Sequence, residues 1–106
     1  MANITIGTSE NFEVILNGDK PVFVDFYATW CGPCRMVSPL IDQLSEEYGD
    51  RITFVKVDVD DEPGIARRFG VMSIPSLILI QDGEIVDQHL GAWPKDLIEE
   101  MLKQVL

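Results

Sequence analysis

The chain has 106 residues, 46% of them hydrophobic, and its 18 acidic against 8 basic residues give a formal net charge of −10. This length suits one domain over residues 1–106, and so acidic a chain would repel nucleic acid and anionic lipid, which we exclude as partners. No run reaches the ~20 apolar residues that a membrane span requires, and residues 1–5 lack the basic flank of a signal peptide, so we expect a cytoplasmic protein.

The first quarter of the chain predicts two strands with a helix between them. Residues 3–6 form a short strand, and the helix runs to Leu16 with Thr8 or Ser9 as its N-cap. Residues 22–28 are a nearly continuous apolar run that only an aspartate interrupts. Such a run is typical of a strand that is buried on both faces of a sheet.

A long helix follows the two cysteines and leads to a second buried strand. Its apolar residues recur at helical spacing: Val37, Leu40, Ile41, Leu44 and Tyr48. Pro39 lies inside this helix, so we expect a bend there. Residues 49–50 end the helix, and residues 52–59 form the strand, which a lysine and an aspartate interrupt.

The last part of the chain predicts a short helix, a hairpin and a final helix. A proline opens the short helix over residues 63–69. Two apolar runs, residues 76–80 and 84–90, have an Asp-Gly pair between them, which is a strong signal for a β-hairpin. Pro94 opens the final helix, whose apolar residues again fall on one side.

The order of these elements, β-α-β-α-β-α-β-β-α, predicts an α/β fold. We expect a central mixed sheet of about five strands, with about four helices on its two faces. The strands over residues 22–28 and 52–59 are joined by a helix, so they should be parallel. The last strand should be antiparallel to the one before it.

The only two cysteines, Cys31 and Cys34, stand three positions apart. A structural disulfide stabilises a fold more when it closes a long loop, so this short spacing favours a redox role. The pair falls where a buried strand meets a helix, and the N–H groups and dipole of a helix N-terminus stabilise a thiolate. We therefore expect Cys31 to be the nucleophile. Cys34, one helical turn further on, should resolve the mixed disulfide that Cys31 forms.

Two other interpretations of the cysteine pair compete with the redox role. The pair could be half of a zinc site, but such a site needs four ligands, and His89 is the only histidine. We expect His89 to be an ordinary strand residue and predict no metal site. The pair could also be an inert disulfide. A Cys-x-x-Cys motif beside a β-α-β pattern is more typical of a redox site.

Residues 24–35, which read VDFYATWCGPCR, closely resemble the active-site segment of bacterial-type thioredoxins. Further segments of that family match in order along the chain: residues 57–60 (VDVD), 73–76 (SIPS), 82–83 (DG) and 91–92 (GA). The resemblance implies a thioredoxin fold and a thiol–disulfide oxidoreductase that reduces protein disulfides as an electron carrier in cell redox homeostasis. It also implies a monomer without a bound cofactor, which a thioredoxin reductase recharges with electrons from NADPH.

Asp25 is a carboxylate inside an apolar strand, where burial should raise its pKa because desolvation disfavours the charged form. A salt bridge would instead keep it ionised, and Lys56 is the obvious partner. The resemblance implies a different role, in which Asp25 accepts and donates the proton of Cys34 through water and Lys56 tunes that carboxylate. A group that titrates near neutral pH can do both.

The resemblance also implies a docking surface around the cysteines. In thioredoxins the bond that matches Ile74–Pro75 is cis, and the backbone at Ile74 would pair with an extended substrate chain. The other residues of this apolar surface would be Trp30, Gly32, Pro33, Met72, Gly91 and Ala92. Trp93 departs from the family pattern, so it either packs at the start of the last helix or enlarges the docking surface.

Two rival functions remain open. A related oxidase or isomerase has the same fold, but histidine between the cysteines is typical of oxidants, whereas Gly32 and Pro33 resemble the spacer of reductants. The chain could also be a binding module in which the thiols are incidental. The sequence does not identify the substrates, and it does not distinguish an NADPH-linked from a ferredoxin-linked reductase.

Overall fold

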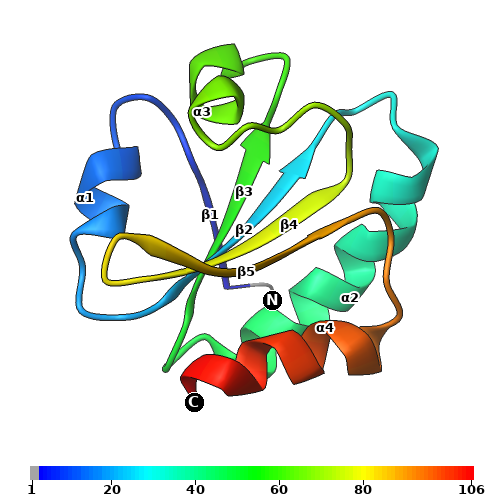
Figure 1. The fold of residues 1–106 in the computed structure, drawn as a ribbon. Coiled ribbons are helices and arrows are strands. Elements are labelled where there is room, and N and C mark those ends of the chain that lie inside the picture. The colour runs from blue at the N-terminus through cyan, green and yellow to red at the C-terminus, as the bar shows by residue number, and fades with distance from the viewer. Residues whose placement is uncertain (1–2) are drawn as a thin grey trace.

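The computed structural model describes residues 3–106 and has the predicted order of strands and helices (Figure 1). The strands are β1 (Ile4–Ile6), β2 (Val22–Tyr27), β3 (Thr53–Asp58), β4 (Ser76–Gln81) and β5 (Glu84–Leu90). The α-helices are α1 (Phe12–Leu16), α2 (Gly32–Tyr48), α3 (Pro63–Arg68) and α4 (Lys95–Leu102), and one 3₁₀ turn (Lys103–Val105) follows α4.

The strands form one mixed sheet in the order β1-β3-β2-β4-β5. β2 and β3 are parallel, as predicted from the helix that joins them. β4 is antiparallel to β2 and to β5. At the hairpin between β4 and β5, Asp82 and Gly83 have φ values of 54° and 80°, which is why the Asp-Gly pair suits this turn. The predicted hairpin is confirmed.

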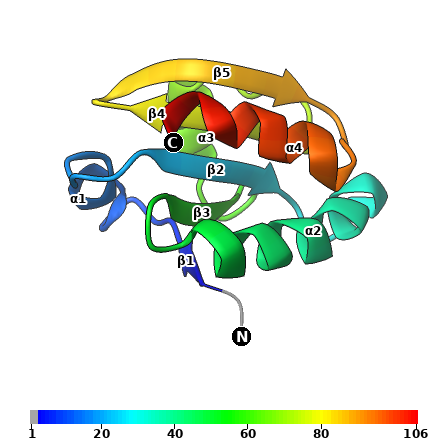
Figure 2. The ribbon, with the colours of Figure 1, turned by 90° about the horizontal axis from the view of Figure 1, so that it is seen from below.

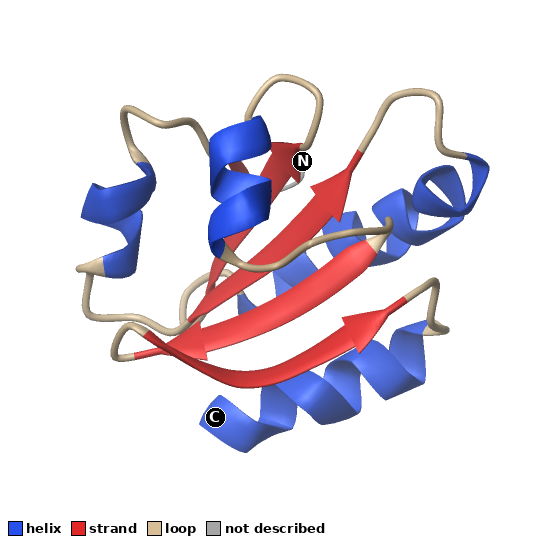
Figure 3. Ribbon diagram, turned by 45° about the horizontal axis from the view of Figure 1, so that its top comes forward, coloured by secondary structure: helices blue, strands red, loops and turns tan. Residues whose placement is uncertain are grey.

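Two helices cover each face of the sheet, as Figures 2 and 3 show. Phe23 of β2 packs in the core under α2 and α4. Its neighbours Val22 and Val24 pack on the other face, under α1 and α3. Because successive side chains of a strand point to opposite faces, Asp25 lies on the same face as Phe23. The carboxylate therefore points toward α2, the helix that carries Cys34.

The start of α1 differs from the prediction. Its N-cap is Asn11, not Thr8 or Ser9. The side chains of Thr8 and Asn11 each accept the other's backbone N–H, at 3.3 and 2.7 Å. This reciprocal pair has the pattern of a capping box, in which the predicted cap Thr8 accepts the N–H three residues on. The Phe12 N–H also donates to the Thr8 carbonyl at 3.0 Å, although α1 itself starts at Phe12 and Asn11 makes no side-chain cap bond.

Three strands, β1, β2 and β3, are one or two residues shorter than predicted, and α2 runs through Pro39 without interruption. β2 ends before Ala28 because the Ala28 carbonyl already accepts the Cys31 N–H in a turn, at 3.2 Å. The bend at Pro39 stays a prediction. α3 begins at Pro63, as expected, whereas Pro94 is the N-cap of α4, which begins at Lys95.

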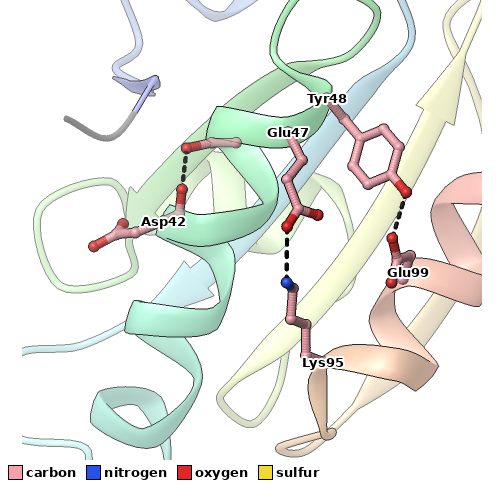
Figure 4. A network of polar contacts seen from close by, with 6 residues as sticks. Asp42, Glu47, Tyr48, Lys95 and Glu99 are labelled. Atoms are coloured by element: carbon pink, nitrogen blue, oxygen red, sulfur yellow. Dashed lines mark hydrogen bonds and ion pairs between the residues drawn. The ribbon is translucent and has the colours of Figure 1, made fainter.

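Polar contacts join α2 to α4 on the surface (Figure 4). Lys95 Nζ donates to Glu47 Oε1 at 2.9 Å, and the Tyr48 hydroxyl donates to Glu99. The bond to Glu99 raises the pKa of Tyr48. These contacts hold the end of α2 against α4, whereas the start of α2 carries the cysteines.

Candidate active site

Cys31 and Cys34 form a disulfide across the first turn of α2, with their Cα atoms 5.3 Å apart. Cys31 is the N-cap of the helix, and its Sγ accepts the Cys34 backbone N–H at 3.2 Å. Gly32 and Pro33 supply the first helical positions, where a missing N–H leaves no bond unmade. Cys31 Sγ therefore already receives one of the N–H groups that a helix N-terminus offers to a thiolate.

An apolar groove of about 450 Å³ opens in front of Cys31. It is lined by predicted residues, Trp30, Cys31, Gly32, Pro33, Met72 and Ile74, and also by Val59, Val71 and Ser73. Met72 is 97% exposed and Trp30 is 67% exposed, so the rim offers apolar surface to a partner. Cys34 does not line this groove.

Cys34 instead lines a separate cavity of about 210 Å³ that it shares with Asp25 and Lys56. Asp25 is 1% exposed, and within residues 3–106 its Oδ1 has no hydrogen-bond partner. Burial raises the pKa of Asp25 to about 6, and the positive charge of Lys56 only partly opposes this rise. The cavity thus places a carboxyl that titrates near neutral pH next to the second cysteine.

Lys56 is paired in register with Asp25 on the neighbouring strand β3, but its ammonium is directed elsewhere. Lys56 Nζ donates to Ser38 Oγ of α2 at 3.0 Å and lies 4.7 Å from the centre of the Tyr27 ring. Among the ion pairs of the described residues, none joins Lys56 to Asp25. The salt bridge that would have kept Asp25 ionised is therefore not formed.

The Ile74–Pro75 peptide bond is cis, as the family resemblance implied. Pro75 leads directly into β4, and its carbonyl accepts the Gly91 N–H at 2.8 Å. Gly91 has a φ of +103°, a conformation open mainly to glycine. Pro75, Gly91 and Ala92, which were also predicted for the docking surface, do not line the Cys31 groove. Ala92 lines another groove, with Met36 and Trp93 among its neighbours.

Comparison with known proteins agrees with this geometry over nearly the whole chain. A family model described as Thioredoxin matches residues 3–104.

The chain belongs to the thioredoxin family.

Several thioredoxins are similar to it. The chain is 46% identical over 99 residues to the thioredoxin of Alicyclobacillus acidocaldarius, covering 93% of this chain and 94% of the relative. It is 49% identical over 92 residues to the thioredoxin of the alga Porphyra purpurea, covering 87% and 86%. It is 44% identical over 98 residues to the thioredoxin of Chlorobaculum thiosulfatiphilum, covering 92% and 91%.

Membership of the thioredoxin family and the Cys31–Cys34 pair make this protein a thiol–disulfide oxidoreductase with a redox-active disulfide. Within residues 3–106, no three His, Cys, Asp or Glu side chains are arranged to hold a metal ion. The zinc interpretation therefore lacks its further ligands in that part of the chain. None of the described helices is long and apolar enough to cross a bilayer.

Besides Val59, Val71 and Ser73 of the groove, the sequence analysis missed two residues that hold predicted site residues through hydrogen bonds. Asp60 Oδ2 accepts the Trp30 Nε1–H at 2.8 Å and so orients the exposed indole beside the groove. Ser38 holds the Lys56 ammonium. Ser38 stands one turn after Cys34 on α2, and this helical spacing was the only signal that could have found it. Nothing in the sequence indicates the contact of Trp30 with Asp60.

Proposed function

We propose that this thioredoxin acts as a reductant of protein disulfides, with Cys31 as the attacking thiolate and Cys34 as the resolving thiol. The observation that most strongly supports this proposal is that the two cysteines line different pockets. Cys31 lines the open apolar groove, whereas Cys34 lines the cavity that holds Asp25. Attack on an external disulfide needs access for the partner, and proton removal needs a base. Thiolate stabilisation at such motifs is a general property for which thioredoxins are a standard example.

The reaction transfers two electrons in two displacements. The Cys31 thiolate attacks one sulfur of the substrate disulfide, forming a mixed disulfide and releasing the other substrate sulfur as a thiolate that takes a proton. The Cys34 thiol then gives its proton to the Asp25 carboxylate through water, for which the cavity of about 210 Å³ has room. The resulting Cys34 thiolate attacks Cys31 Sγ, closes the disulfide and releases the second substrate thiolate.

The groove in front of Cys31 would bind the substrate as an extended chain. Ile74 and Pro75 would offer backbone groups to that chain, as in strand addition. The apolar side chains of Trp30 and Met72 would cover residues beside the substrate disulfide. Gly91 and Ala92 would extend this surface, and Gly32 and Pro33 would set the reducing character of the pair.

A thioredoxin reductase would restore the dithiol with electrons from NADPH, so that the protein serves as an electron carrier in cell redox homeostasis. We propose a single domain over residues 1–106, working as a monomer in the cytoplasm. A protein that acts as a reductant has to work in a compartment that keeps thiols reduced, and the cytoplasm is such a compartment.

The test is coupled reduction of an insulin disulfide by a thioredoxin reductase and NADPH, with Cys31→Ser as the inactive control. The account expects turnover in the native protein and none in the variant. A reduction potential well above the cytosolic range would instead favour an oxidase or isomerase. A biological role that survives Cys31→Ser would favour the binding module.

A further inference from the structure

His89 and Trp93 form an aromatic stack beside the docking surface. Their ring centres are 3.5 Å apart and their planes differ by 11°. His89 is paired with Leu77 across β4 and β5, and Leu77 belongs to the core under α2 and α4. His89 therefore lies on that face of the sheet. Trp93, which precedes α4, packs against the same core.

The stack closes the base of a short loop that carries the predicted docking residues Gly91 and Ala92. Within the loop, the Gly91 N–H donates to the Pro75 carbonyl at 2.8 Å. This bond continues the β4–β5 ladder past the pair of Ser76 and Leu90. A shift of the loop would therefore move the Pro75 carbonyl, one residue from Ile74 in the Cys31 groove.

Trp93 also connects the loop to α2. It lines a groove of about 320 Å³ together with Ala92 and with Met36 and Leu40 of α2. Met36 stands two residues after Cys34. The indole thus contacts β5 through His89 and lies beside the helix that carries the cysteines. Neither His89 nor Trp93 lines the Cys31 groove or the Asp25 cavity.

We propose that the stack of His89 on Trp93 is a positioning element that fixes the Gly91–Ala92 loop, and through it the Pro75 carbonyl, for binding of a protein disulfide. The proposal deepens the proposed function, because it rests on substrate docking at Ile74–Pro75. Since neither ring lines the Cys31 groove or the Asp25 cavity, loss of the stack should weaken binding of a large substrate and leave the thiol chemistry intact. Trp93 thereby acts in specificity, although it reaches the substrate only through the loop.

The experiment compares insulin with a small aromatic disulfide as substrates of the reduced protein. Stacked aromatic pairs contribute enough to change an equilibrium by about two- to tenfold, so His89→Ala and Trp93→Ala should each raise KM for insulin by about that factor. The kcat for insulin and the rate with the small disulfide should stay unchanged. Trp93→Phe, which keeps a ring on His89, should restore most of the native KM. Ile98→Val is the matched control, since it loosens the same core but keeps both rings.

Three outcomes would overturn the proposal. One is an unchanged KM for insulin in His89→Ala. His89 is half-buried on an edge strand, so this variant tests the stack even if Trp93→Ala does not fold. Another is an equal loss of rate with insulin and with the small disulfide. The third is an equal rise of the KM for insulin in Ile98→Val, which would mean that loosening of the core, and not loss of the stack, weakens substrate binding. Failure of the proposed docking site is distinguishable, because Met72→Ala and Ile74→Ala would then also leave KM for insulin unchanged.

Discussion

Asp25 and Lys56 stand side by side on the parallel strands β2 and β3, yet the lysine ammonium bonds to Ser38 and leaves Asp25 Oδ1 without a hydrogen-bond partner among the described residues. The carboxyl is buried beside a positive charge that does not contact it. Its pKa is consequently raised to about 6, which suits proton exchange with Cys34 and costs stability when the carboxyl ionises.

Asp25→Asn should stabilise the fold at neutral pH. The pKa of Asp25 rises from 3.8 in the unfolded chain to about 6 in the folded one. Between these values the folded state holds a proton that the unfolded state releases, so stability falls as the pH rises through this window. A shift of this size corresponds to roughly 2–3 kcal/mol lost above pH ~7. The asparagine variant should regain this amount.

Urea unfolding at several pH values measures the effect. The advantage of Asp25→Asn should disappear below about pH 4, where the carboxyl is protonated in both states. Glu10→Gln, a change at an exposed carboxylate, is the control and should show no such pH-dependent gain. An advantage that persists unchanged into acid would mean that better packing, and not titration of Asp25, stabilises the variant.

The same substitution should slow the resolving step, because asparagine cannot accept the Cys34 proton. We expect a loss of about tenfold or more above pH ~7 and little loss below pH ~5, where native Asp25 is itself protonated. The ratio of native to variant turnover with insulin, followed across pH, checks this. A ratio that does not vary with pH would rule out Asp25 as the base.

Lys56→Met should raise the pKa of Asp25 further, because the lysine charge is what partly opposes the effect of burial. In the Lys56→Met background, the pH above which Asp25→Asn lowers turnover should therefore be higher than in the native background. Carbon-13 NMR of the Asp25 carboxyl follows this titration directly. Lys103→Met removes an exposed lysine that pairs with Glu100 and should leave the pKa of Asp25 unchanged. An equal shift in Lys103→Met would point to net charge as the cause.

Gly91→Ala should destabilise the loop beside the docking surface. A side chain at a φ of +103° is strained even though open space surrounds the position, which should cost about 1–3 kcal/mol. Gly64→Ala provides the matched comparison, since Gly64 lies in α3 with no atom near the added Cβ and alanine there should be neutral or stabilising. Thermal unfolding of both variants measures the difference. An equal loss of stability in Gly91→Ala and Gly64→Ala would contradict the strain assigned to Gly91.

The order of the elements was predictable because each signal is local. The apolar run over residues 22–28 indicates a buried strand, and the Asp-Gly pair indicates a hairpin. Even the direction of Asp25 follows from alternation, once Phe23 is placed under α2. The start of α1 was predicted less well. Asn11 stands at the N-cap position, whereas Thr8, one of the two predicted caps, makes its capping bond to the Asn11 N–H one turn earlier.

What the sequence could not reveal are contacts between residues that only the fold brings together. Trp30 and Asp60 are thirty positions apart, and their hydrogen bond depends on how the ends of β2 and β3 lie side by side. The stack of His89 on Trp93 depends on the tight loop at Gly91. His89 was expected to be an ordinary strand residue, and no spacing in the sequence distinguishes it from one.

The proposal that Cys31 attacks the substrate and Cys34 resolves the mixed disulfide is tested most directly by trapping that mixed disulfide with a protein substrate. Cys34→Ser, with Cys31 intact, should accumulate a covalent complex that mass spectrometry locates at Cys31 and that dithiothreitol releases. Cys31→Ser should form no such complex, because Cys34 faces the Asp25 cavity and not the open groove. A complex that forms equally well through Cys34 in Cys31→Ser would contradict the account.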